Sequence, residues 1–502
     1  MRLEEIILKN LETNQDDKCY WFNGEWHNRK NMLELINTCE KFLISSGFKS
    51  GQRLVIMLKN DPMFIALALA IWKLHGTICP LNEKAGNDAL KHTLNLIQPF
   101  GLIISSEAER NINDEIKNAW PNIIYDGNSS FNNLNLSGII RESSDENIAV
   151  IFSTSGTTGN PKAVPLTHGN LISNCTEVKK HIYEYEQSDI FLNALPNFHS
   201  FGFTCSMMLP LSFGAKIAIV PSFLPPAGTV RALLEAKVNV MYVVPAMMSY
   251  LVMAASKNKI PIEAFTSQKF ICTGGDRLNP GVYSQAIKLF GRNMITEGYG
   301  LTETSPVVCM NKDIKSSKAG SVGPIIPGYE FKLKTRENLP TDLNEGVLWV
   351  KGGSVTPGYY KAPEITAERF DSDGFFNTGD YVQIDSDGYV TILDRVTDII
   401  IVSGFNVYPQ EVEKILSEHP AVQTAIVVGM PHATNGEIPE AYIQRKEGFN
   451  NVTEREIIKF AKERLAHFKV PRKVEFVDEF PLSGTGKILR RILREKAGRR
   501  SL

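Results

Sequence analysis

Short apolar runs alternate along most of the chain with longer segments in which apolar residues recur at helical spacing. The short runs have the length of buried strands, whereas segments such as 62–74 are long enough to form helices. This alternation predicts an α/β fold built in layers, without a solenoid repeat. The strands expected from it include Leu54–Leu58, Thr77–Pro80, Gly101–Ser105, Ala149–Ser153, Lys216–Val220 and Lys269–Thr273.

After residue 350 the composition shifts toward closely spaced turns and shorter strands. Two of the turns, at Asp371 and Asp385, share the sequence Asp-Ser-Asp-Gly, which also occurs in calcium loops. A calcium loop of the EF-hand type needs a glutamate at its twelfth position, where these segments have Val382 and Val396. We therefore expect both segments to be turns that connect strands.

The end of the chain has the pattern of a separate small α/β domain. Pro409 is a favourable first residue for one helix, and Thr453 with Glu456 forms a capping-box pattern at the start of another. At 502 residues, the chain is also too long for a single hydrophobic core. We predict a large α/β body of several subdomains at 1–393 and a small α/β C-terminal domain at 398–502. The strands expected in the small domain are 398–402, 423–428, 441–445 and 474–477.

The overall composition is that of an ordinary globular protein, with 43% apolar residues, 22% charged residues and a formal net charge of −1. This balance gives no indication of a nucleic acid or an anionic membrane as partner. The seven cysteines form no CxxC pair, so neither a disulfide framework nor a zinc site is expected. A reducing, cytoplasmic location fits this pattern.

The apolar segment 238–255 raises the question of a membrane span. Asn239, Pro245 and Ser249 interrupt it, and we interpret it as a buried strand followed by an apolar helix. Residues 1–10 lack the uncharged apolar stretch of a signal peptide. The sequence therefore predicts no transmembrane segment.

The strongest chemical signal is a loop rich in hydroxyls and glycines, with the sequence Ser153-Thr-Ser-Gly-Thr-Thr-Gly-Asn-Pro-Lys162. It follows an apolar strand, and its backbone N–H groups, hydroxyls and lysine are suited to binding phosphate oxygens. A flexible linker is the structural alternative, but linkers do not normally end in Pro-Lys before a new strand. A standard P-loop is disfavoured because its lysine would follow glycine and enter a helix.

A second motif has the sequence Glu297-Gly-Tyr-Gly-Leu-Thr-Glu-Thr304. Thr302 can bond a phosphate oxygen, and Glu303 offers the hard oxygen ligand that Mg²⁺ prefers. A turn before a helix is an equally good explanation of this motif alone. Three further motifs are weaker. In Asn377–Asp380, the aspartate could accept hydrogen bonds from a ribose diol. The other two are Leu393–Arg395 with Ser403–Asn406, and the glycine loop Pro481–Lys487.

Together and in this order, the motifs resemble those of the acyl-adenylate-forming (AMP-binding) superfamily. This superfamily includes acyl-CoA synthetases, adenylation domains of peptide synthetases and firefly-type luciferases, and the resemblance covers nearly the whole chain. Within the superfamily, the chain is most similar to fatty acyl-CoA ligases in two segments, Leu195–Phe203 and Asp394–Pro409.

The resemblance implies that ATP is held between the motifs. In the family, Thr302 would contact the α-phosphate, Glu303 would bind Mg²⁺, and Lys487 would bridge the substrate carboxylate and the α-phosphate. His199 would lie beside the acyl carboxylate, although a packed core histidine is the alternative. The remaining nucleotide or cofactor contacts implied by the resemblance are Ser153, Thr154, Ser155, Gly156, Thr157, Thr158, Gly159, Lys162, Gly274, Gly275, Asp276, Arg277, Gly298, Tyr299, Gly300, Asp380, Arg395, Ser403 and Gly404.

The family also implies a mobile small domain that rotates about a hinge, here at 394–397, between two half-reactions. The rotation exchanges the loop of Lys487 for the loop at 403–406. The usual pivot residue is Asp or Lys, and this chain has Thr397 there. Ala163 replaces the usual glycine after the loop lysine. The first departure changes the charge of the hinge rather than the chemistry.

The candidate acyl pocket is apolar and rich in methionine, and ordinary core packing explains its residues equally well. No acidic residue is placed to bind an amino group, so we expect a medium- or long-chain fatty acid rather than an amino acid. Phe203 lies where some long-chain enzymes have a gating aromatic residue. The candidate pocket residues are Phe201, Phe203, Val243 and Met247.

Three functional alternatives remain open at the level of sequence. The first is transfer of the acyl group to coenzyme A, and the second is transfer to the phosphopantetheine of an acyl carrier protein. The basic tail at 490–500 would suit either acceptor, or it is a solvated helix. The third is a non-catalytic adenylate-binding scaffold, which the retention of Glu303 and Lys487 disfavours. Chain length of the acid, pathway and oligomeric state are not indicated.

Overall fold

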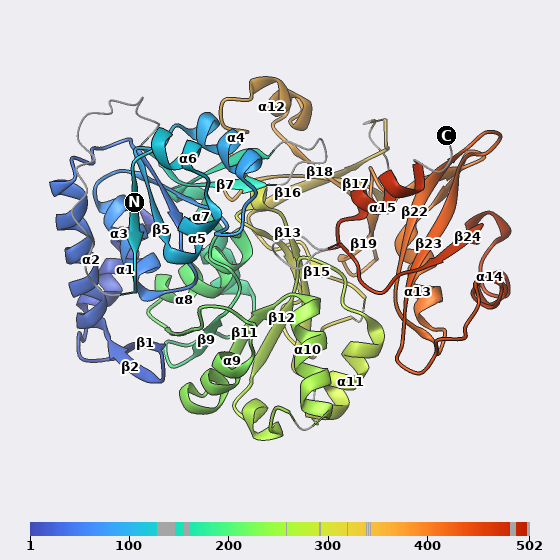
Figure 1. Cartoon of the computed structure of the whole chain (residues 1–502), viewed down its shortest axis with the longest axis horizontal. Coiled ribbons are helices and arrows are strands. Elements are labelled where there is room, and N and C mark those ends of the chain that lie inside the picture. Colours follow the sequence, from blue (N-terminus) through green and yellow to red (C-terminus); the bar gives the residue numbers. More distant parts are fainter. Residues whose placement is uncertain are drawn as a thin grey trace. The chain divides into compact units, whose positions relative to one another are not determined.

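The computed structural model describes residues 1–127, 146–154, 161–257, 259–290, 293–318, 320–337, 339, 341, 343–481 and 488–498. The chain forms two compact units (Figure 1). The first unit comprises 1–330 and 350–376, and the second comprises 331–349 and 377–502. Both are mixed α/β, which confirms the predicted fold class. The predicted division at 394–397 lies inside the second unit and stays a prediction.

The larger sheet of the first unit has eight strands in the order β14-β13-β12-β11-β9-β10-β1-β2. All neighbours from β13 to β1 are parallel, and the two outermost pairs are antiparallel. The carboxyl ends of parallel strands meet at one edge, so the segments after β9, β11, β12 and β13 leave the sheet side by side. The strands are β1 (Lys18–Phe22), β2 (Glu25–Asn28), β9 (Ile190–Asn193), β10 (Lys216–Ile219), β11 (Val240–Val243), β12 (Phe270–Thr273), β13 (Ile295–Gly300) and β14 (Val307–Met310).

The other sheet of the first unit has six strands in the order β6-β5-β3-β4-β7-β8. It is parallel except for β7 and β8, which form an antiparallel pair. The expected strands at 54–58, 77–80, 101–105 and 149–153 all lie in it. Its members are β3 (Arg53–Met57), β4 (Thr77–Pro80), β5 (Gly101–Ser105), β6 (Asn122–Tyr125), β7 (Ile148–Thr154) and β8 (Lys162–Thr167).

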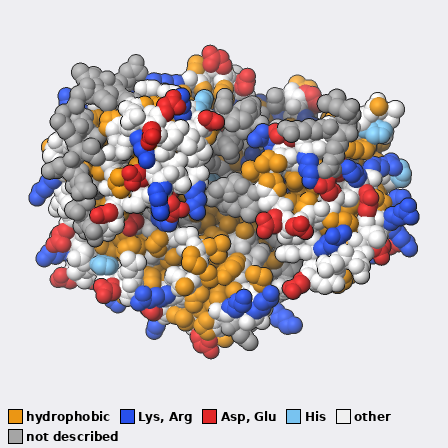
Figure 2. Space-filling model, in the orientation of Figure 1, with side chains coloured by type: hydrophobic (Ala, Val, Ile, Leu, Met, Phe, Trp, Pro, Cys, Tyr) orange, Lys and Arg blue, Asp and Glu red, His pale blue; other side chains and the backbone are white. Residues whose placement is uncertain are grey.

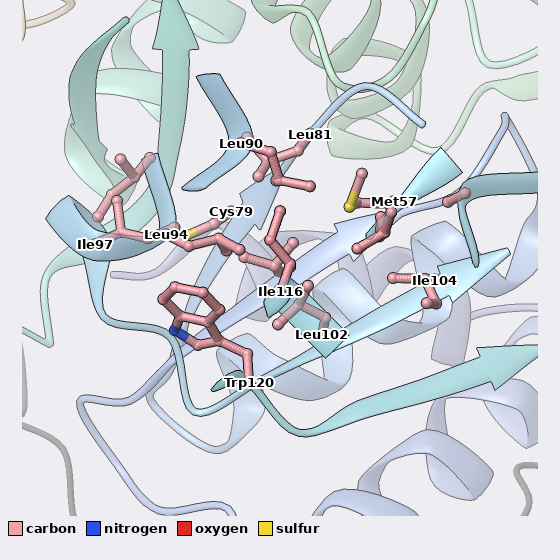
Figure 3. Packing of buried hydrophobic residues seen from close by; sticks show 14 of the residues in the cluster. Met57, Cys79, Leu81, Leu90, Leu94, Ile97, Leu102, Ile104, Ile116 and Trp120 are labelled. Carbon is pink, nitrogen blue, oxygen red and sulfur yellow. The ribbon is translucent and has the colours of Figure 1, made fainter. Parts of the chain in front are cut away.

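One face of this six-stranded sheet is covered by helices α4 (Asn87–Ile97) and α6 (Asp114–Ala119). Figure 3 shows Leu94 of α4 and Ile116 of α6 lying over Leu102 of β5, with Trp120 closing one side. All of these side chains are at most 6% exposed. Burying such aliphatic side chains stabilises the fold by about 1.5–3 kcal/mol each.

Helix α3 (Pro62–Lys73) is unusual because it is buried around its whole circumference from Pro62 to Trp72. The side chain of Asp61 caps it by accepting from the N–H of Met63 at 2.8 Å. The sequence lacks a polar stripe here because the helix has no solvent face. The other helical elements of the first unit are α1 (Leu3–Glu12), α2 (Arg29–Ser45), α5 (Ser106–Asn111), α7 (His168–His181), η1 (Gly202–Met208), α8 (Leu209–Ser212), α9 (Ala227–Arg231), η2 (Ala232–Ala236), α10 (Pro245–Ser256), η3 (Ile262–Phe265), α11 (Pro280–Phe290), η4 (Thr302–Thr304) and α12 (Pro363–Arg369).

The apolar segment 238–255 forms strand β11 and then helix α10, which begins at Pro245, as expected. Within the described residues, no helix is long and apolar enough to cross a membrane. The surface over α9 and α10 is rich in apolar side chains (Figure 2), and Met253 of α10 is 49% exposed. Met248 and Leu251 on the same helix are fully buried. The sequence of α10 is continuously apolar because apolar side chains lie on both its buried and its exposed faces.

The second unit contains two sheets. One joins β16 (Tyr329–Lys334), β17 (Glu345–Gly352), β18 (Phe376–Ile384) and β19 (Tyr389–Arg395) in the order β19-β18-β17-β16. The short strand β15 (Gly323–Pro324) belongs to the first unit. The other contains a long hairpin of β22 and β23, with β20 and β24 pairing with β23. The elements of this part are β20 (Ile400–Val402), β21 (Phe405–Val407), α13 (Pro409–Ser417), β22 (Val422–His432), β23 (Gly436–Arg445), α14 (Glu454–Lys462), η5 (His467–Lys469), β24 (Lys473–Phe476) and α15 (Arg490–Gly498).

Local signals in the second half of the chain are confirmed. Thr453 caps α14 in a capping box with Glu456, and Pro409 is the first residue of α13. The carboxylates of Asp371 and Asp385 accept backbone N–H groups two and four residues ahead, so both Asp-Ser-Asp-Gly segments are Asx turns. The turn at 385–388 connects β18 to β19, as expected, whereas the turn at 371–374 follows helix α12 (Pro363–Arg369) and leads into β18, flanked by the isolated bridge between Phe370 and Phe376.

Candidate functional site

Part of the predicted site of the first unit lies at the carboxyl edge of the eight-stranded sheet. The hydroxyl of Ser200, in the segment after β9, lies 3.1 Å from that of Thr302, in the segment after β13. Strands β11 and β12 lie between β9 and β13 in the sheet. At their ends, the N–H of Gly274 after β12 donates to the carbonyl of Val243 of β11 at 3.1 Å. The parallel order of the strands brings these segments together.

Glycines allow the backbone segments at this edge to approach closely. A Cβ atom at Gly300 would lie 1.9 Å from the carbonyl oxygen of Pro306, so only glycine fits there. A Cβ atom at Gly274 would lie 3.2 Å from both the carbonyl oxygen of Gly298 and the ring of Phe201. The predicted adenine strip, the second motif and the predicted acyl pocket therefore meet at one point.

The remaining residues of these two motifs are placed less centrally. Gly275 has a φ of +84° and is exposed together with Asp276, whose carboxylate accepts from the N–H of Arg277 at 2.8 Å. Tyr299 lies in β13 opposite Cys309 and is partly buried. Their predicted contacts with a nucleotide stay predictions.

The neck of the predicted phosphate loop is a β-hairpin. Thr154 at the end of β7 is in register with Lys162 at the start of β8, and its hydroxyl lies 3.5 Å from the Lys162 carbonyl. The hydroxyl of Ser153 lies 3.4 Å from that of Thr93. The predicted contacts Ser155, Gly156, Thr157, Thr158 and Gly159 lie outside the described residues, as does Lys487.

A tyrosine that the sequence motifs did not include connects the two strongest motifs. The hydroxyl of Tyr359 donates to Oε1 of Glu303 at 2.8 Å, and its ring centroid lies 5.2 Å from Nζ of Lys162. Burial and the charge of Glu303 raise the pKa of Tyr359 well above its usual value, and Arg369 offsets this in part. Its position in the sequence Gly-Tyr-Tyr, soon after a turn-rich stretch, was the one available signal.

His199 lies in the turn that leads into the π-helix η1. Its Nδ1 accepts from the N–H of Phe201 at 3.3 Å, and its backbone bonds Pro196 and Phe203. The side chain is partly exposed, which differs from a packed core histidine. Proximity of His199 to an acyl carboxylate stays a prediction.

The two phenylalanines predicted for the acyl pocket have different surroundings. Phe203 is fully buried and its ring packs edge-on against Phe64, Trp72 and Phe152, with centroids 6.5, 6.1 and 5.3 Å away. Phe201 is only partly buried and packs edge-on against Tyr242 at 5.9 Å. The surroundings of Phe203 are those of a core residue, and its gating role stays a prediction.

In the second unit, the predicted ribose contacts lie beside each other. Asp380 and Arg395 are paired across β18 and β19, and Nε of Arg395 lies 3.2 Å from Oδ1 of Asp380. Ser403 and Gly404 form the tip of the β20–β21 hairpin, with φ values of 50° and 85°. Positive φ at both central residues is the geometry of a type I′ turn.

Comparison with known proteins decides the family. A family model for AMP-binding enzymes matches residues 8–360, and a model for the C-terminal domain of these enzymes matches residues 411–487. The chain belongs to the AMP-binding enzyme family. The resemblance inferred from the motifs is thereby confirmed.

Curated relatives within the AMP-binding enzymes carry the names of several acid–CoA ligases. The long-chain-fatty-acid–CoA ligase of Haemophilus influenzae is 33% identical over 362 residues, which cover 71% of this chain. That match spans only 63% of the relative's own length. The long-chain-fatty-acid–CoA ligase of Bacillus subtilis is 30% identical over 91% of this chain and 87% of its own. The probable 4-coumarate–CoA ligase 1 of Dictyostelium discoideum is 29% identical over 98% and 94%.

Solved structures of AMP-binding enzymes share the whole fold. The crystal structure of ATP-bound MatB from Rhodopseudomonas palustris has a TM-score of 0.88, with 25% identity over 99% of each chain. The structure of the anthranilate CoA ligase AuaEII in complex with anthranoyl-AMP also has a TM-score of 0.88, at 23% identity over 100% of this chain and 98% of that one. The second likeness concerns the fold alone.

The oxygen atoms at Glu303 are suited to a Mg²⁺ ion that would also be bound by the phosphates of ATP. The carboxylate of Glu303 and the hydroxyl of Thr302 are hard oxygen ligands. Across the described ranges, no group of three His, Cys, Asp or Glu residues could hold a metal ion by itself.

Asp394, at the start of the predicted hinge, lies in a buried charge cluster. It is 1% exposed, and its carboxylate accepts from the N–H groups of Arg395 and Gln410 at 2.8 and 3.1 Å. Burial raises its pKa to about 7, with Arg490 opposing and Glu413 adding to the shift. Arg490 itself forms a bidentate pair with Glu413, one contact being 2.8 Å. Within the described part of the basic tail, Arg490 and Arg494 are therefore ion-paired, the latter with Asp398 at 2.8 Å.

We expect Asp394 to make the stability of this AMP-binding enzyme depend on pH. Its pKa in the folded state is raised from 3.8 to about 7, so the folded chain keeps a proton that the unfolded chain releases in this interval. Stability therefore falls as the pH rises through this window. The variant Asp394→Asn lacks this titrating group. The free energy of unfolding of the variant minus that of wild type should therefore increase by about 2–3 kcal/mol between pH 5 and pH 8.

Denaturant unfolding of the second unit at several pH values measures this difference. The matched control is Asp387→Asn in the exposed turn at 385–388 of the same unit. A pH-independent difference for Asp394→Asn would contradict the expectation.

Proposed function

We propose that this chain is an AMP-forming acid–thiol ligase. In the first step, an oxygen of a carboxylate attacks the α-phosphorus of ATP, and pyrophosphate leaves as its bond to that phosphorus breaks. In the second step, a thiol sulfur attacks the acyl carbonyl carbon and AMP leaves with the bonding electrons. The thiol proton goes to solvent. The products are a thioester, AMP and pyrophosphate.

The observation that supports this proposal most directly is that Tyr359 contacts both Lys162 of β8 and Glu303 of η4, and Thr302 precedes Glu303 in the same short helix. A lysine at the neck of a hydroxyl-rich loop and a carboxylate with a neighbouring hydroxyl are the groups needed around a triphosphate. Both reactants are anions, so their mutual repulsion dominates the barrier. Positioning and electrostatic stabilisation lower such a barrier more than any protein nucleophile would.

Each residue has a role in this scheme. Lys162 and the loop before it hold the β- and γ-phosphates, and the hydroxyls of Thr302 and Ser200 donate toward the α-phosphate. Lys487 bridges the carboxylate and the α-phosphate, and Asp380 with Arg395 binds the ribose. Bound Mg²⁺ at Glu303 would neutralise charge on the phosphate oxygens.

The state of the cysteines supports an external acceptor thiol. All seven cysteines are buried and free. Burial raises the pKa of Cys272, beside the adenine strip, to about 12, and it raises the pKa of Cys205 further. A thiol held in its protonated form is a poor nucleophile. The acyl group therefore passes directly to an external thiol, with coenzyme A as the first candidate, rather than through an enzyme thioester.

A fatty acid of medium or long chain is the proposed substrate. Two of the relatives above are named long-chain-fatty-acid–CoA ligases, and the residues around the edge, such as Val243, Met247 and Phe201, are apolar. An aromatic acid is the second candidate, because another relative is named a probable 4-coumarate–CoA ligase.

The test is acid-dependent exchange of labelled pyrophosphate into ATP, with a panel of acetate, octanoate, palmitate, 4-coumarate, benzoate and single amino acids. We expect octanoate or palmitate to give the fastest exchange. A preference for acetate or an amino acid would refute the fatty-acid assignment, and no exchange with any acid would favour a non-catalytic scaffold. Adding coenzyme A or a phosphopantetheinylated carrier protein in turn then identifies the acceptor.

A further inference from the structure

The side chain of Tyr359 stands between the lysine and the carboxylate on which the proposed ATP site depends. Its hydroxyl donates to Glu303 at 2.8 Å, and the face of its ring is turned toward the ammonium of Lys162 at 5.2 Å. Only 5% of the residue is exposed. One side chain therefore contacts both groups, which come from β8 and η4 and are 141 positions apart in the chain numbering (303 − 162).

The backbone around Tyr359 is held on the same two elements. The N–H of Thr356 donates to the Glu303 carbonyl at 2.8 Å, and the N–H of Tyr360 donates to the Ala163 carbonyl at 2.9 Å. Tyr359 itself donates its N–H to the hydroxyl of Thr366 at 2.8 Å. The segment 356–360 therefore connects the strand of Lys162 to the short helix of Glu303.

Gly358 makes this arrangement sterically possible. Its φ is +142°, a value that side chains rarely adopt, and a Cβ atom there would lie 2.6 Å from Cγ2 of Thr366. The chain is thus constrained immediately before Tyr359. A constrained backbone and a buried ring leave the hydroxyl little freedom to leave Glu303.

The contacts are suited to fixing two opposite charges at a set spacing. A hydroxyl that donates to a carboxylate orients it and occupies one of its lone pairs. The π face of an aromatic ring attracts an ammonium group and also separates it from the carboxylate. Without the ring, Lys162 could pair directly with Glu303, and each would then be withdrawn from a triphosphate.

We propose that Tyr359 is a positioning residue of the ATP site, which holds Glu303 and Lys162 apart and oriented so that both act on one triphosphate. The proposal rests on the proposed function for the identity of the ligand. Its residues belong entirely to the first unit.

Three variants test the proposal. Tyr359→Phe removes only the hydroxyl, Tyr359→Leu removes hydroxyl and ring, and Tyr360→Phe is the matched control at the neighbouring position, whose ring lies 5.8 Å from Arg53 instead. Binding of Mn²⁺ in the presence of ATP is measured by electron paramagnetic resonance of the full chain, without acid. In parallel, the Mg²⁺ dependence of acid-dependent pyrophosphate exchange is measured.

We expect Tyr359→Phe to weaken Mn²⁺ binding about tenfold, in line with the loss of a hydrogen bond to a charged group. The Mg²⁺ concentration for half-maximal exchange should rise by the same factor. Tyr359→Leu should also raise the KM for ATP, because Lys162 is then released toward Glu303. Thioester formation from ready-made acyl-AMP should keep its wild-type rate in both variants, and Tyr360→Phe should match wild type throughout.

A double-mutant comparison with Glu303→Gln keeps the proposal falsifiable if Tyr359→Phe lowers thermal stability. If Tyr359 acts through Glu303, adding Tyr359→Phe to Glu303→Gln changes Mn²⁺ binding by less than twofold. Unchanged Mn²⁺ binding and Mg²⁺ dependence in Tyr359→Phe would overturn the proposal, as would additive effects in the double variant. Wild-type exchange activity in the same assay shows separately whether the proposed function holds.

Discussion

Replacing Lys487 with alanine is expected to slow acid-dependent pyrophosphate exchange by about 10²–10³-fold, the typical effect of removing one preorganised donor to a developing charge. The reason is electrostatic, because an anionic carboxylate must approach an anionic phosphate. A lysine that contacts both lowers this repulsion at the moment of attack. The measurement is single-turnover formation of acyl-AMP, which isolates the first step from product release.

The second half-reaction provides the internal comparison for Lys487. Transfer from ready-made acyl-AMP to coenzyme A should remain within a few-fold of wild type in Lys487→Ala, because the carboxylate and pyrophosphate are no longer involved. Lys462→Ala, on the exposed side of α14, is the matched control and should leave both steps unchanged. Formation of acyl-AMP at the normal rate in Lys487→Ala would refute the proposed role of the lysine.

Replacing Phe203 with alanine is expected to lower the free energy of unfolding by about 3–5 kcal/mol, the usual cost of deleting a buried aromatic side chain. The ring of Phe203 is fully buried and packs edge-on against the rings of Trp72 in α3 and Phe152 in β7. A closely packed surrounding relaxes only partly into the space that the ring leaves, so a cavity remains. Denaturant unfolding followed by tryptophan fluorescence reports on the change, since Trp72 lies in the same cluster.

Phe201→Ala distinguishes packing from substrate binding. Phe201 is partly exposed and adjoins the backbone of Gly274, so its loss should cost less stability and instead change the relative exchange rates with octanoate and palmitate. If Phe203→Ala shifted this preference while leaving stability intact, the gating role predicted from the sequence would be correct and the core interpretation wrong.

Much of the local structure was predictable because its causes lie within a few residues of each other. The apolar runs at 77–80 and 101–105 became strands with those bounds, and Thr453 began a helix by capping it. The two Asp-Ser-Asp-Gly turns formed through contacts of each aspartate with the residues just after it. The position of the Ser153–Lys162 loop at the end of a strand was visible for the same reason.

The candidate site was only partly predictable. Thr302 and Glu303 were identified from their motif, whereas Tyr359 was not, because a lone tyrosine after a glycine has no distinctive pattern. The same limit applied to Arg490. Its basic neighbours indicated a solvated tail, yet it pairs with Glu413 from a helix far earlier in the chain. Such pairings depend on which helices and strands become neighbours in the fold, and the local sequence does not indicate which elements these are.

The sequence by itself determined the family and the α/β class, since both are expressed in short contiguous motifs and in the alternation of apolar runs. Only the tertiary structure decided that Phe203 packs in a core while Phe201 lies at the site edge, and that Tyr359 joins Lys162 to Glu303. The physical reason is that strand order and helix packing bring together residues more than a hundred positions apart. These long-range contacts, rather than local propensity, set the burial and the partners of each side chain.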